Sequence, residues 1–546
     1  MASASEQAKE AKTDIVDTVW KACAYGDFEK LKAFVDADPA VVNKPDDQGY
    51  LALQWAALNN QVSIISLLLE HGADPNGRDL SGQTPLHWSA VRGALPAAET
   101  LLRVGARTEQ KDYKGYTVCH VAAQYGQTAV IYHLALKWNV DICVVDADGR
   151  TPLHWAAYKG FADTVRLLLV LNAEFSLADK EGCTPLHWAA IRGNSEAATV
   201  LLQGGARSTL SQPDMTGATP GQLAFDKGHR SLGFHLLESS QDPGKGKMCG
   251  KNSRFAKLAE LQLAPVIWLL IISLLTIFIY KIILDPEIGS ITVSLAFWSW
   301  TCVISSGVGL IFLLKTTSSD PGMIPVGYAS DGKGAKPSDE NAGEKESLYR
   351  NLDSQVLWAG NWNQLCVTCK IVRPLRAKHC AVTDRCIEVF DHYCPWVGNA
   401  VGKGNRHYFI TFLWLELFAM VISGVIAVIR LQGILQSEQW QKNSGVTWVI
   451  TFLVIDAFVG LSVAALAITQ ASQAVRNLTT NEMANWYRYK YLRSQDGTFK
   501  NPFDKGMWSN CRETCLPSLA PRAPVSLDMD RDMESLLPVE KGDRSI

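Results

Sequence analysis

Four long apolar runs in the second half of the chain restrict its fold more than any other feature. Each run approaches or exceeds the ~20 residues that a helix needs to cross the ~30 Å hydrocarbon core of a bilayer. Lipid offers no partner for backbone N–H and C=O groups, so such runs cross as α-helices. We therefore predict four transmembrane helices, at residues 263–284, 291–314, 408–429 and 446–470.

Two of the predicted spans contain a carboxylic acid, Glu416 in the third and Asp456 in the fourth. Ionisable groups are costly in lipid, and they often line a cavity or a functional pathway. The alternative is a hydrogen bond between neighbouring helices, which needs no cavity. The sequence leaves both interpretations open.

The first half of the chain is a repeat. The glycine of a D-x-x-G turn recurs at intervals of 33 to 35 residues, and T-P-L-H-W follows it three times. A period of 33 residues with T-P-L-H is typical of ankyrin repeats, in which each unit adds a turn and two antiparallel helices to a solenoid. We predict six to seven repeats in residues 14–240, with degenerate units at both ends.

The T-P-L-H motifs place histidines at equivalent positions of the repeats. A metal site is conceivable, but a histidine that opens a helix is expected to make hydrogen bonds within the turn. Ankyrin arrays bind proteins, so we expect protein partners. The net charge of −2 provides no field for nucleic acid, and no such partner is expected. The histidines of the T-P-L-H motifs are His87, His154 and His187.

The number of membrane crossings and the distribution of Lys and Arg between the loops predict the membrane topology. The first residues are polar and lack the apolar core of a signal peptide, so the repeats are expected in the cytosol. Two crossings return residues 315–407 to the cytosol, and two more leave residues 472–546 there as a tail. Lys and Arg gather in the 315–407 loop and are absent from 285–290, as the positive-inside rule requires. The polar stretch 328–348 is predicted to be a linker.

Five of the 13 cysteines lie within the short stretch 366–394. Cysteines stay reduced in the cytosol, where clusters of them favour metal binding or catalysis over disulfides. A C-x2-C pair with a downstream His and Cys supplies the four ligands of a closed structural zinc site. We predict one structural zinc, held by Cys366, Cys369, His379 and Cys386.

The string Asp391-His392-Tyr393-Cys394 follows the predicted metal site. A thiol becomes a strong nucleophile when an imidazole accepts its proton and a carboxylate orients that imidazole. We therefore predict catalytic roles for Cys394, His392 and Asp391. The string gains weight from its place on a metal-held loop beside a membrane, where a thiol can meet an acyl chain.

These motifs together resemble the DHHC family of protein S-acyltransferases (palmitoyltransferases), in its branch with ankyrin repeats. Residues 360–407 resemble the family's cysteine-rich domain. Three further motifs match the family's pattern, namely Asp320-Pro321-Gly322, Thr479-Thr480-Asn481-Glu482 and Asn510. The resemblance implies an all-α fold, an ankyrin-repeat solenoid followed by a four-helix transmembrane bundle with a cytosolic zinc-binding domain.

The resemblance also implies an activity. In this family a cysteine takes a fatty acyl group from acyl-CoA as a thioester, and the thiol of a substrate protein then receives it. Cys394 matches the nucleophile, His392 the base and Asp391 the acid that orients it. Substrate proteins are expected to dock on the array, which we expect to be dispensable for the chemistry. The expected address is an endomembrane, the Golgi, with the plasma membrane as the alternative.

One feature departs from the family pattern. The family normally carries a second zinc in this domain, and its ligands would fall on Cys380, Thr383, Tyr393 and Ala400. Only the first of these is a zinc ligand, so we expect one zinc per chain. Loss of the second zinc site would weaken catalysis, so we keep an alternative function open. In that alternative the chain is a catalytically weak, membrane-anchored ankyrin scaffold that binds partner proteins.

Overall fold

The computed structural model describes residues 17–240, 263–285, 291–325, 352–436 and 445–516. The predicted linker at 328–348 and the tail beyond 516 lie outside the described residues. The chain divides into two compact units. One unit comprises residues 1–249 and 336–372 and includes the array. The other comprises residues 250–335 and 373–546 and includes the long apolar helices.

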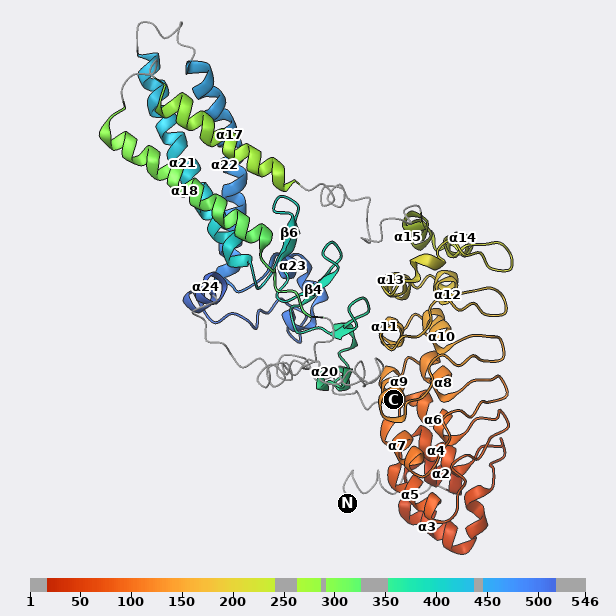
Figure 1. Cartoon of the computed structure of the whole chain (residues 1–546). Coiled ribbons are helices and arrows are strands. Elements are labelled where there is room, and N and C mark those ends of the chain that lie inside the picture. The colour runs from red at the N-terminus through yellow and green to blue at the C-terminus, as the bar shows by residue number, and fades with distance from the viewer. Residues whose placement is uncertain (1–16, 241–262, 286–290, 326–351, 437–444, 517–546) are drawn as a thin grey trace, which may run out of the picture. The chain divides into compact units, whose positions relative to one another are not determined.

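The array consists of helix pairs that stack on one another, as Figure 1 shows from α2 to α15. The described residues contain seven such pairs. Their bounds are α2 Val19–Tyr25 and α3 Phe28–Ala37, α4 Ala52–Leu58 and α5 Val62–Glu70, α6 Pro85–Arg92 and α7 Leu95–Arg103, α8 Val118–Gln124 and α9 Thr128–Trp138, α10 Pro152–Lys159 and α11 Ala162–Val170, α12 Pro185–Arg192 and α13 Ser195–Gln203, and α14 Pro220–Asp226 and α15 Arg230–Ser240.

The T-P-L-H histidines make turn hydrogen bonds, as predicted. In α10, His154 Nδ1 accepts the backbone N–H of Thr151 at 3.0 Å, and Nε2 donates to the carbonyl of Cys183 in the next repeat at 3.2 Å. Burial lowers the pKa of His154 to about 4, so it stays neutral as these bonds require. Equivalent bonds start the other motif helices, at His87, His120 and His187.

A segment after the second apolar helix completes the core of the array. It comprises α20 (Gln355–Trp358), a short 3-10 helix (Trp362–Gln364) and the hairpin of β1 (Leu365–Cys366) and β2 (Ile371–Val372). Leu352, Leu357, Trp362 and Leu365 belong to the same buried cluster as the repeat helices. The expectation of a dispensable array did not foresee this shared core.

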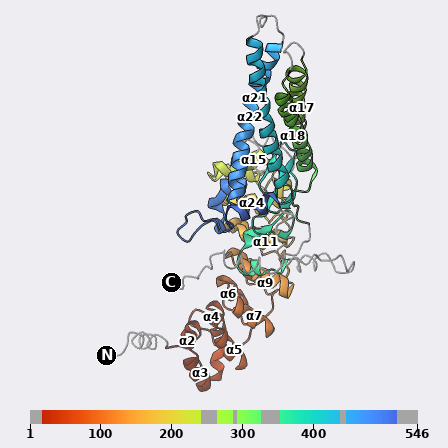
Figure 2. The ribbon, with the colours of Figure 1, turned by 90° about the vertical axis from the view of Figure 1, so that its left-hand side faces the viewer.

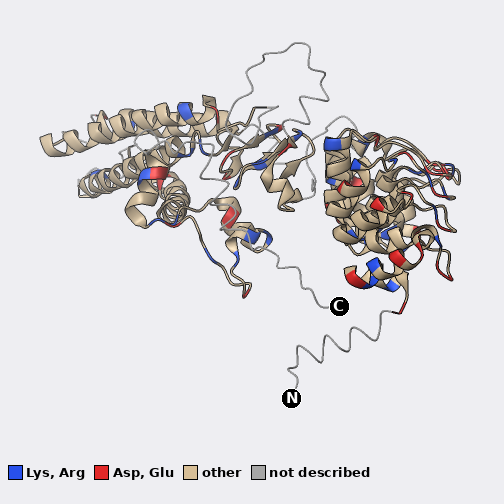
Figure 3. Ribbon diagram, turned by 90° about the horizontal axis from the view of Figure 1, so that it is seen from below, with Lys and Arg blue, Asp and Glu red and all other residues tan. Residues whose placement is uncertain are grey.

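Four long apolar helices form the bundle of the second unit. They are α17 (Ala264–Ile277, continued as a π-helix to Ile283), α18 (Val293–Ser318), α21 (Arg406–Leu435) and α22 (Gly445–Val475). All four are long and apolar enough to cross a membrane. They lie side by side in Figures 1 and 2, and few charged residues mark them in Figure 3. The chain therefore fits a membrane protein.

This unit also contains two further hairpins, two short α-helices and two 3-10 helices, the last at Trp486–Arg488 and Lys490–Leu492. The hairpins are β3 (Lys378–Cys380) with β4 (Arg385–Ile387), and β5 (His392–Cys394) with β6 (Asn399–Val401). After α22 come α23 (Thr480–Asn485) and α24 (Met507–Cys515). The side chain of Asn510 in α24 is buried and donates to the carbonyl of Val475 at 2.7 Å, which ties α24 to the end of α22.

Candidate active site and metal centre

The β5–β6 hairpin separates two sets of side chains. Successive residues of a strand point to opposite faces, so His392 and Cys394 share one face and Tyr393 lies on the other. No unusual bend of the backbone is needed to bring the imidazole to the thiol. Tyr393 is paired with Ala400 across the hairpin. The predicted catalytic pair and Tyr393, a position that the family resemblance assigns to a second zinc, therefore occupy opposite faces of one small element.

The end of α18 holds this hairpin. The side-chain amide of Asn399 donates to the backbone carbonyls of Thr316, Thr317 and Ser319, at 3.1, 3.1 and 2.9 Å. Carbonyls in the last turn of a helix lack partners within the helix, so Asn399 caps α18 and is fixed by it. The strand that carries Cys394 is thereby attached to the end of a membrane helix.

Asp391 and His392 form a close hydrogen-bonded pair, with 2.6 Å between Asp391 Oδ2 and His392 Nδ1. The Asp391 side chain is fully buried. This contact leaves Nε2 of His392 as the ring nitrogen that can accept the thiol proton. The three predicted catalytic residues are thus brought together on one short strand and the residue before it.

Residues far along the chain complete the environment of Asp391. Thr480 donates to it from its backbone N–H at 2.7 Å and from its hydroxyl at 2.9 Å. Gln470 Nε2 lies 3.3 Å from Asp391 Oδ2, and Arg406 Nη2 lies 3.7 Å from Oδ1. Sequence reasoning noted Thr480 only as part of a motif and missed Gln470 and Arg406. The T-T-N-E string after the fourth span was the available signal for Thr480.

The first and last residues of the T-T-N-E string, Thr479 and Glu482, are also held in place. Thr479 caps α23 in a capping box with Glu482, whose carboxylate also receives two hydrogen bonds from Arg376, both at 2.8 Å. Both partners of this ion pair are nearly buried. An arginine that makes two hydrogen bonds to one carboxylate fixes the relative orientation of the two side chains. It therefore fixes α23, and with it the donors of Thr480.

Opposing effects set the protonation of the pair. Burial lowers the pKa of His392, but hydrogen bonds with Asp391 and Cys394 outweigh it and raise that pKa to about 9. Burial raises the pKa of Asp391, but the bond with His392 and the charge of Arg406 bring it below its usual range. The imidazole therefore holds a proton firmly once it has accepted one.

An apolar cavity of about 400 Å³ opens beside Cys394. It runs between the helices of the bundle, and Phe409, Leu413, Ala419 and Phe452 are among the residues that line it. The residues of α21 in its wall extend from Phe409 to Ser423, which is ~20 Å at the 1.5 Å rise of a helix. A long, apolar cavity that ends at a thiol can hold a hydrocarbon chain.

Both acids of the predicted spans line this cavity. Glu416 accepts the hydroxyl of Ser306 at 3.0 Å, and Asp456 lies 3.4 Å from the hydroxyl of Ser423. The two interpretations left open by the sequence therefore both hold, because each acid has a partner on a neighbouring helix and each faces the cavity.

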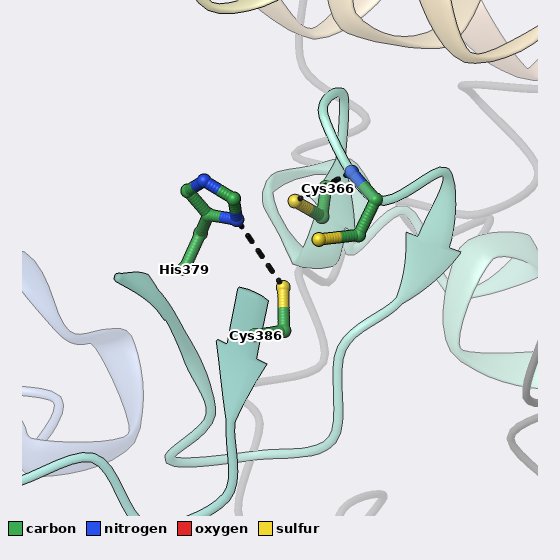
Figure 4. A group of neighbouring side chains, drawn as sticks. Cys366, His379 and Cys386 are labelled. Carbon is green, nitrogen blue, oxygen red and sulfur yellow. Dashed lines mark hydrogen bonds between the residues drawn. The ribbon is translucent and has the colours of Figure 1, made fainter. Parts of the chain in front are cut away.

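Cys366, Cys369, His379 and Cys386 form the predicted metal cluster, shown in part in Figure 4, and their ligand atoms all lie within 4.8 Å of one another. His379 Nδ1 lies 3.9 Å from Cys386 Sγ, and its Nε2 lies 3.6 Å from the carboxylate of Asp384. Metal-bound histidines commonly give their second nitrogen to a carboxylate. Three thiols and one imidazole suit a closed zinc site, so the residues present fit zinc.

Three of the four positions that the family resemblance assigns to a second zinc lie in a small apolar core. Cys380 and Ala400 are buried against Ile387 and Phe390, and Tyr393 packs against them. Among the described residues, these positions form no metal-ligand cluster. Side-chain packing therefore fills the space that the family resemblance assigns to a second metal.

Comparison with known proteins agrees with this architecture. The family model described as DHHC palmitoyltransferase matches residues 361–487, and the ankyrin-repeat model matches residues 19–112, 104–179 and 162–245. The chain is 40% identical over 528 residues to "Probable protein S-acyltransferase 23" of Arabidopsis thaliana, covering 94% of both chains. It is 31% identical to "Palmitoyltransferase ZDHHC17" of Danio rerio, covering 90% of this chain and 86% of the relative. It is 30% identical to "Palmitoyltransferase akr1" of Schizosaccharomyces pombe, covering 96% of each.

Proposed function

Because the chain belongs to the DHHC palmitoyltransferase family, in its form with ankyrin repeats, we propose that Cys394 is the residue that carries the acyl group. The chain is a protein S-acyltransferase, and protein S-palmitoylation is its activity. One observation supports the assignment to Cys394 most strongly. Its thiol borders the long apolar cavity and lies on the same strand face as His392, which is paired with a buried carboxylate.

The reaction has two steps. In the first, His392 accepts the thiol proton, the sulfur of Cys394 attacks the thioester carbonyl of acyl-CoA, and the bond to the CoA sulfur breaks. The proton on His392 neutralises the departing CoA thiolate. In the second step, His392 takes the proton of a substrate cysteine, whose sulfur attacks the acyl-Cys394 thioester. The bond between the acyl carbon and the sulfur of Cys394 breaks, and His392 passes the proton to the departing Cys394 thiolate.

The cavity holds the acyl chain during both steps. Its ~20 Å wall along α21 accepts a long chain with the carbonyl end at Cys394. The apolar lining replaces the lipid environment from which the chain comes, so the chain enters without a large desolvation cost. The carbonyl is thereby held close to the thiol, which raises the effective concentration of the reacting groups.

The zinc has a structural role in this proposal. Cys366, Cys369, His379 and Cys386 would hold it with all four tetrahedral positions, leaving none for substrate. When bound, the metal would fix the hairpins of the cysteine-rich domain in place. The chemistry of acyl transfer belongs to Cys394, His392 and Asp391.

The array serves protein recognition. Ankyrin repeats are protein-interaction modules, and we propose that substrate proteins dock there before they meet the acyl-enzyme. The positive-inside pattern supports a cytosolic cysteine-rich domain and cytosolic termini. We propose the Golgi as the address and the plasma membrane as the alternative.

Labelling with acyl-CoA tests the proposal. Purified protein incubated with radiolabelled palmitoyl-CoA is expected to incorporate label that hydroxylamine removes, because hydroxylamine cleaves thioesters. Cys394→Ser should abolish this label, whereas Cys511→Ser, on α24 and outside the cavity lining, should keep it. Label that persists in Cys394→Ser would disprove the assignment, and unlabelled wild-type protein would favour the scaffold alternative.

A further inference from the structure

Helix α9 of the array (Thr128–Trp138) is buried around much more of its circumference than a repeat helix requires. Every residue from Val130 to Ala135 is buried. A helix that only covers its neighbours buries one stripe, and a helix buried all round needs a further partner on its second face. Helix α11 (Ala162–Val170) shows the same feature, with residues 167–171 buried.

The partner is a segment of the same chain, residues 352–367. Leu352, Leu357, Trp362 and Leu365 of this segment share one buried cluster with the residues of α9 and α11. The segment ends in β1, which carries the first predicted metal ligand, Cys366. The array therefore contributes packing to the start of the metal-binding loop.

Tyr132 of α9 is the central contact. It is fully buried, and its hydroxyl donates to the backbone carbonyl of Leu352 at 2.6 Å while accepting the N–H of Ser354 at 3.4 Å. Its ring meets those of Trp358 and Trp362 edge to face, with centroids 4.6 and 5.2 Å away. Edge-to-face aromatic pairs and a satisfied buried hydroxyl both favour one orientation of the segment.

Contacts on either side of the ligand pair continue this attachment. Val367 lies against Gly204, where an added Cβ would approach Val367 Cγ1 to 2.9 Å. The hydroxyl of Thr368 donates to the carbonyl of Gln203 at 3.3 Å, and Lys370 donates to Asn172. The residues between and beside Cys366 and Cys369 are thus held by the ends of α11 and α13.

We propose that Tyr132 is a positioning residue for acyl transfer and that the array acts as a structural part of the metal centre. Through residues 352–367 and the contacts of Thr368 and Lys370, the array fixes Cys366 and Cys369 in the spacing that the zinc requires. The proposal rests on the proposed function only in that the metal loop serves acyl transfer. It makes the array an essential part of the enzyme as well as a docking module.

Zinc retention in the full-length protein tests this role. The variants are Tyr132→Phe, which keeps the ring and removes the hydroxyl, and Trp362→Ala, which alters the segment and leaves the repeats unchanged. Tyr125→Phe is the matched control, because Tyr125 is exposed in the same repeat. Zinc-loaded protein in detergent is mixed with a colorimetric chelator, and the rate of zinc release is recorded. Thermal unfolding and Cys394 labelling are measured in parallel.

Zinc release is expected to be roughly 2- to 10-fold faster in Tyr132→Phe, the range set by a buried hydrogen bond. It should be roughly 10²-fold faster in Trp362→Ala, where a large buried ring is lost, and unchanged in Tyr125→Phe. Wild-type release rates in both Tyr132→Phe and Trp362→Ala would overturn the proposal. If Tyr132→Phe fails to fold, Trp362→Ala alone decides. Unchanged release with normal Cys394 labelling refutes this proposal alone, whereas an unlabelled wild type refutes the proposed function.

Discussion

Thr480 donates to Asp391 twice, from its backbone N–H at 2.7 Å and from its hydroxyl at 2.9 Å. The two residues are 89 positions apart and lie on opposite sides of the last two membrane helices in the sequence. Asp391 in turn accepts from His392, which lies on the same strand face as Cys394. The chain segment after the fourth helix therefore helps to set the geometry of the proposed catalytic base, His392.

Thr480→Val should slow autoacylation without removing the nucleophile. The change deletes one hydrogen bond to a buried charged group, a bond worth ~1.5–3 kcal/mol, so the rate should fall roughly 10- to 100-fold. Thr480→Ser keeps the hydroxyl and should retain most of the rate. Initial rates of Cys394 labelling would show the difference. Equal rates for the Val and Ser variants would show that the hydroxyl of Thr480 does not contribute to acyl transfer.

His392→Ala should lower the labelling rate at neutral pH by roughly 10²–10⁴-fold, because the thiol loses its base. The pKa of His392 is raised to about 9, so in the wild type the imidazole keeps an accepted proton across neutral pH. The wild-type rate should therefore change little between about pH 7 and about pH 8.5. The variant rate should climb steeply over the same interval, as hydroxide replaces the lost base. A variant whose rate does not recover with rising pH would contradict the base role.

The number of bound zinc ions should be one per chain. The first site keeps four good ligands, whereas Cys380 and Ala400 lie in an apolar core with Tyr393. Metal analysis should therefore give a ratio near one, and Cys366→Ala should lose both metal and acylation. Cys380→Ala, which shortens one apolar side chain, should be tolerated at a cost of about 1 kcal/mol.

Rebuilding the second site is the complementary experiment. Thr383→Cys, Tyr393→His and Ala400→Cys together should raise the zinc ratio towards two, and each change alone should add no metal, since an incomplete ligand set gains little affinity. A ratio of two in the unaltered protein would show that the ligands are wrongly assigned.

Filling the cavity should shorten the preferred acyl chain. Ala419 lines it on α21, ten residues beyond Phe409, which corresponds to ~15 Å along the helix. Ala419→Phe should reduce labelling by palmitoyl-CoA far more than labelling by a medium-chain acyl-CoA. Val425→Phe places the same ring on an exposed position outside the cavity lining and serves as the control. Equal loss with both chain lengths, in Ala419→Phe protein that unfolds at the wild-type temperature, would contradict the acyl assignment.

Structural features that depend on local or repeated sequence patterns could be predicted from the sequence. The 33-residue repeat and the four apolar runs depend on local pattern, and the structure has helices at each predicted position. The metal ligands are also close in sequence, and their spacing suits the two hairpins that carry them. Patterns of this kind are repeated or local, so they do not require knowledge of tertiary contacts.

Contacts between distant segments could not be predicted. The bond from Thr480 to Asp391 joins residues 89 positions apart, and that from Tyr132 to Leu352 joins residues 220 positions apart. A single sequence contains no sign of which distant residues meet. The burial of α9 on its second face, and its coverage there by residues 352–367, appear only in the structure.

Site-resolved mass spectrometry tests the central claim most directly. Purified protein would be incubated briefly with palmitoyl-CoA, digested at low pH to preserve thioesters, and its cysteine peptides analysed. One palmitoyl group is expected on the peptide that contains Cys394. It should disappear when a substrate protein with a free cysteine is added, and it should appear on that protein. A palmitoyl group that resides on other cysteines, with the Cys394 peptide unmodified at every time point, would contradict this claim.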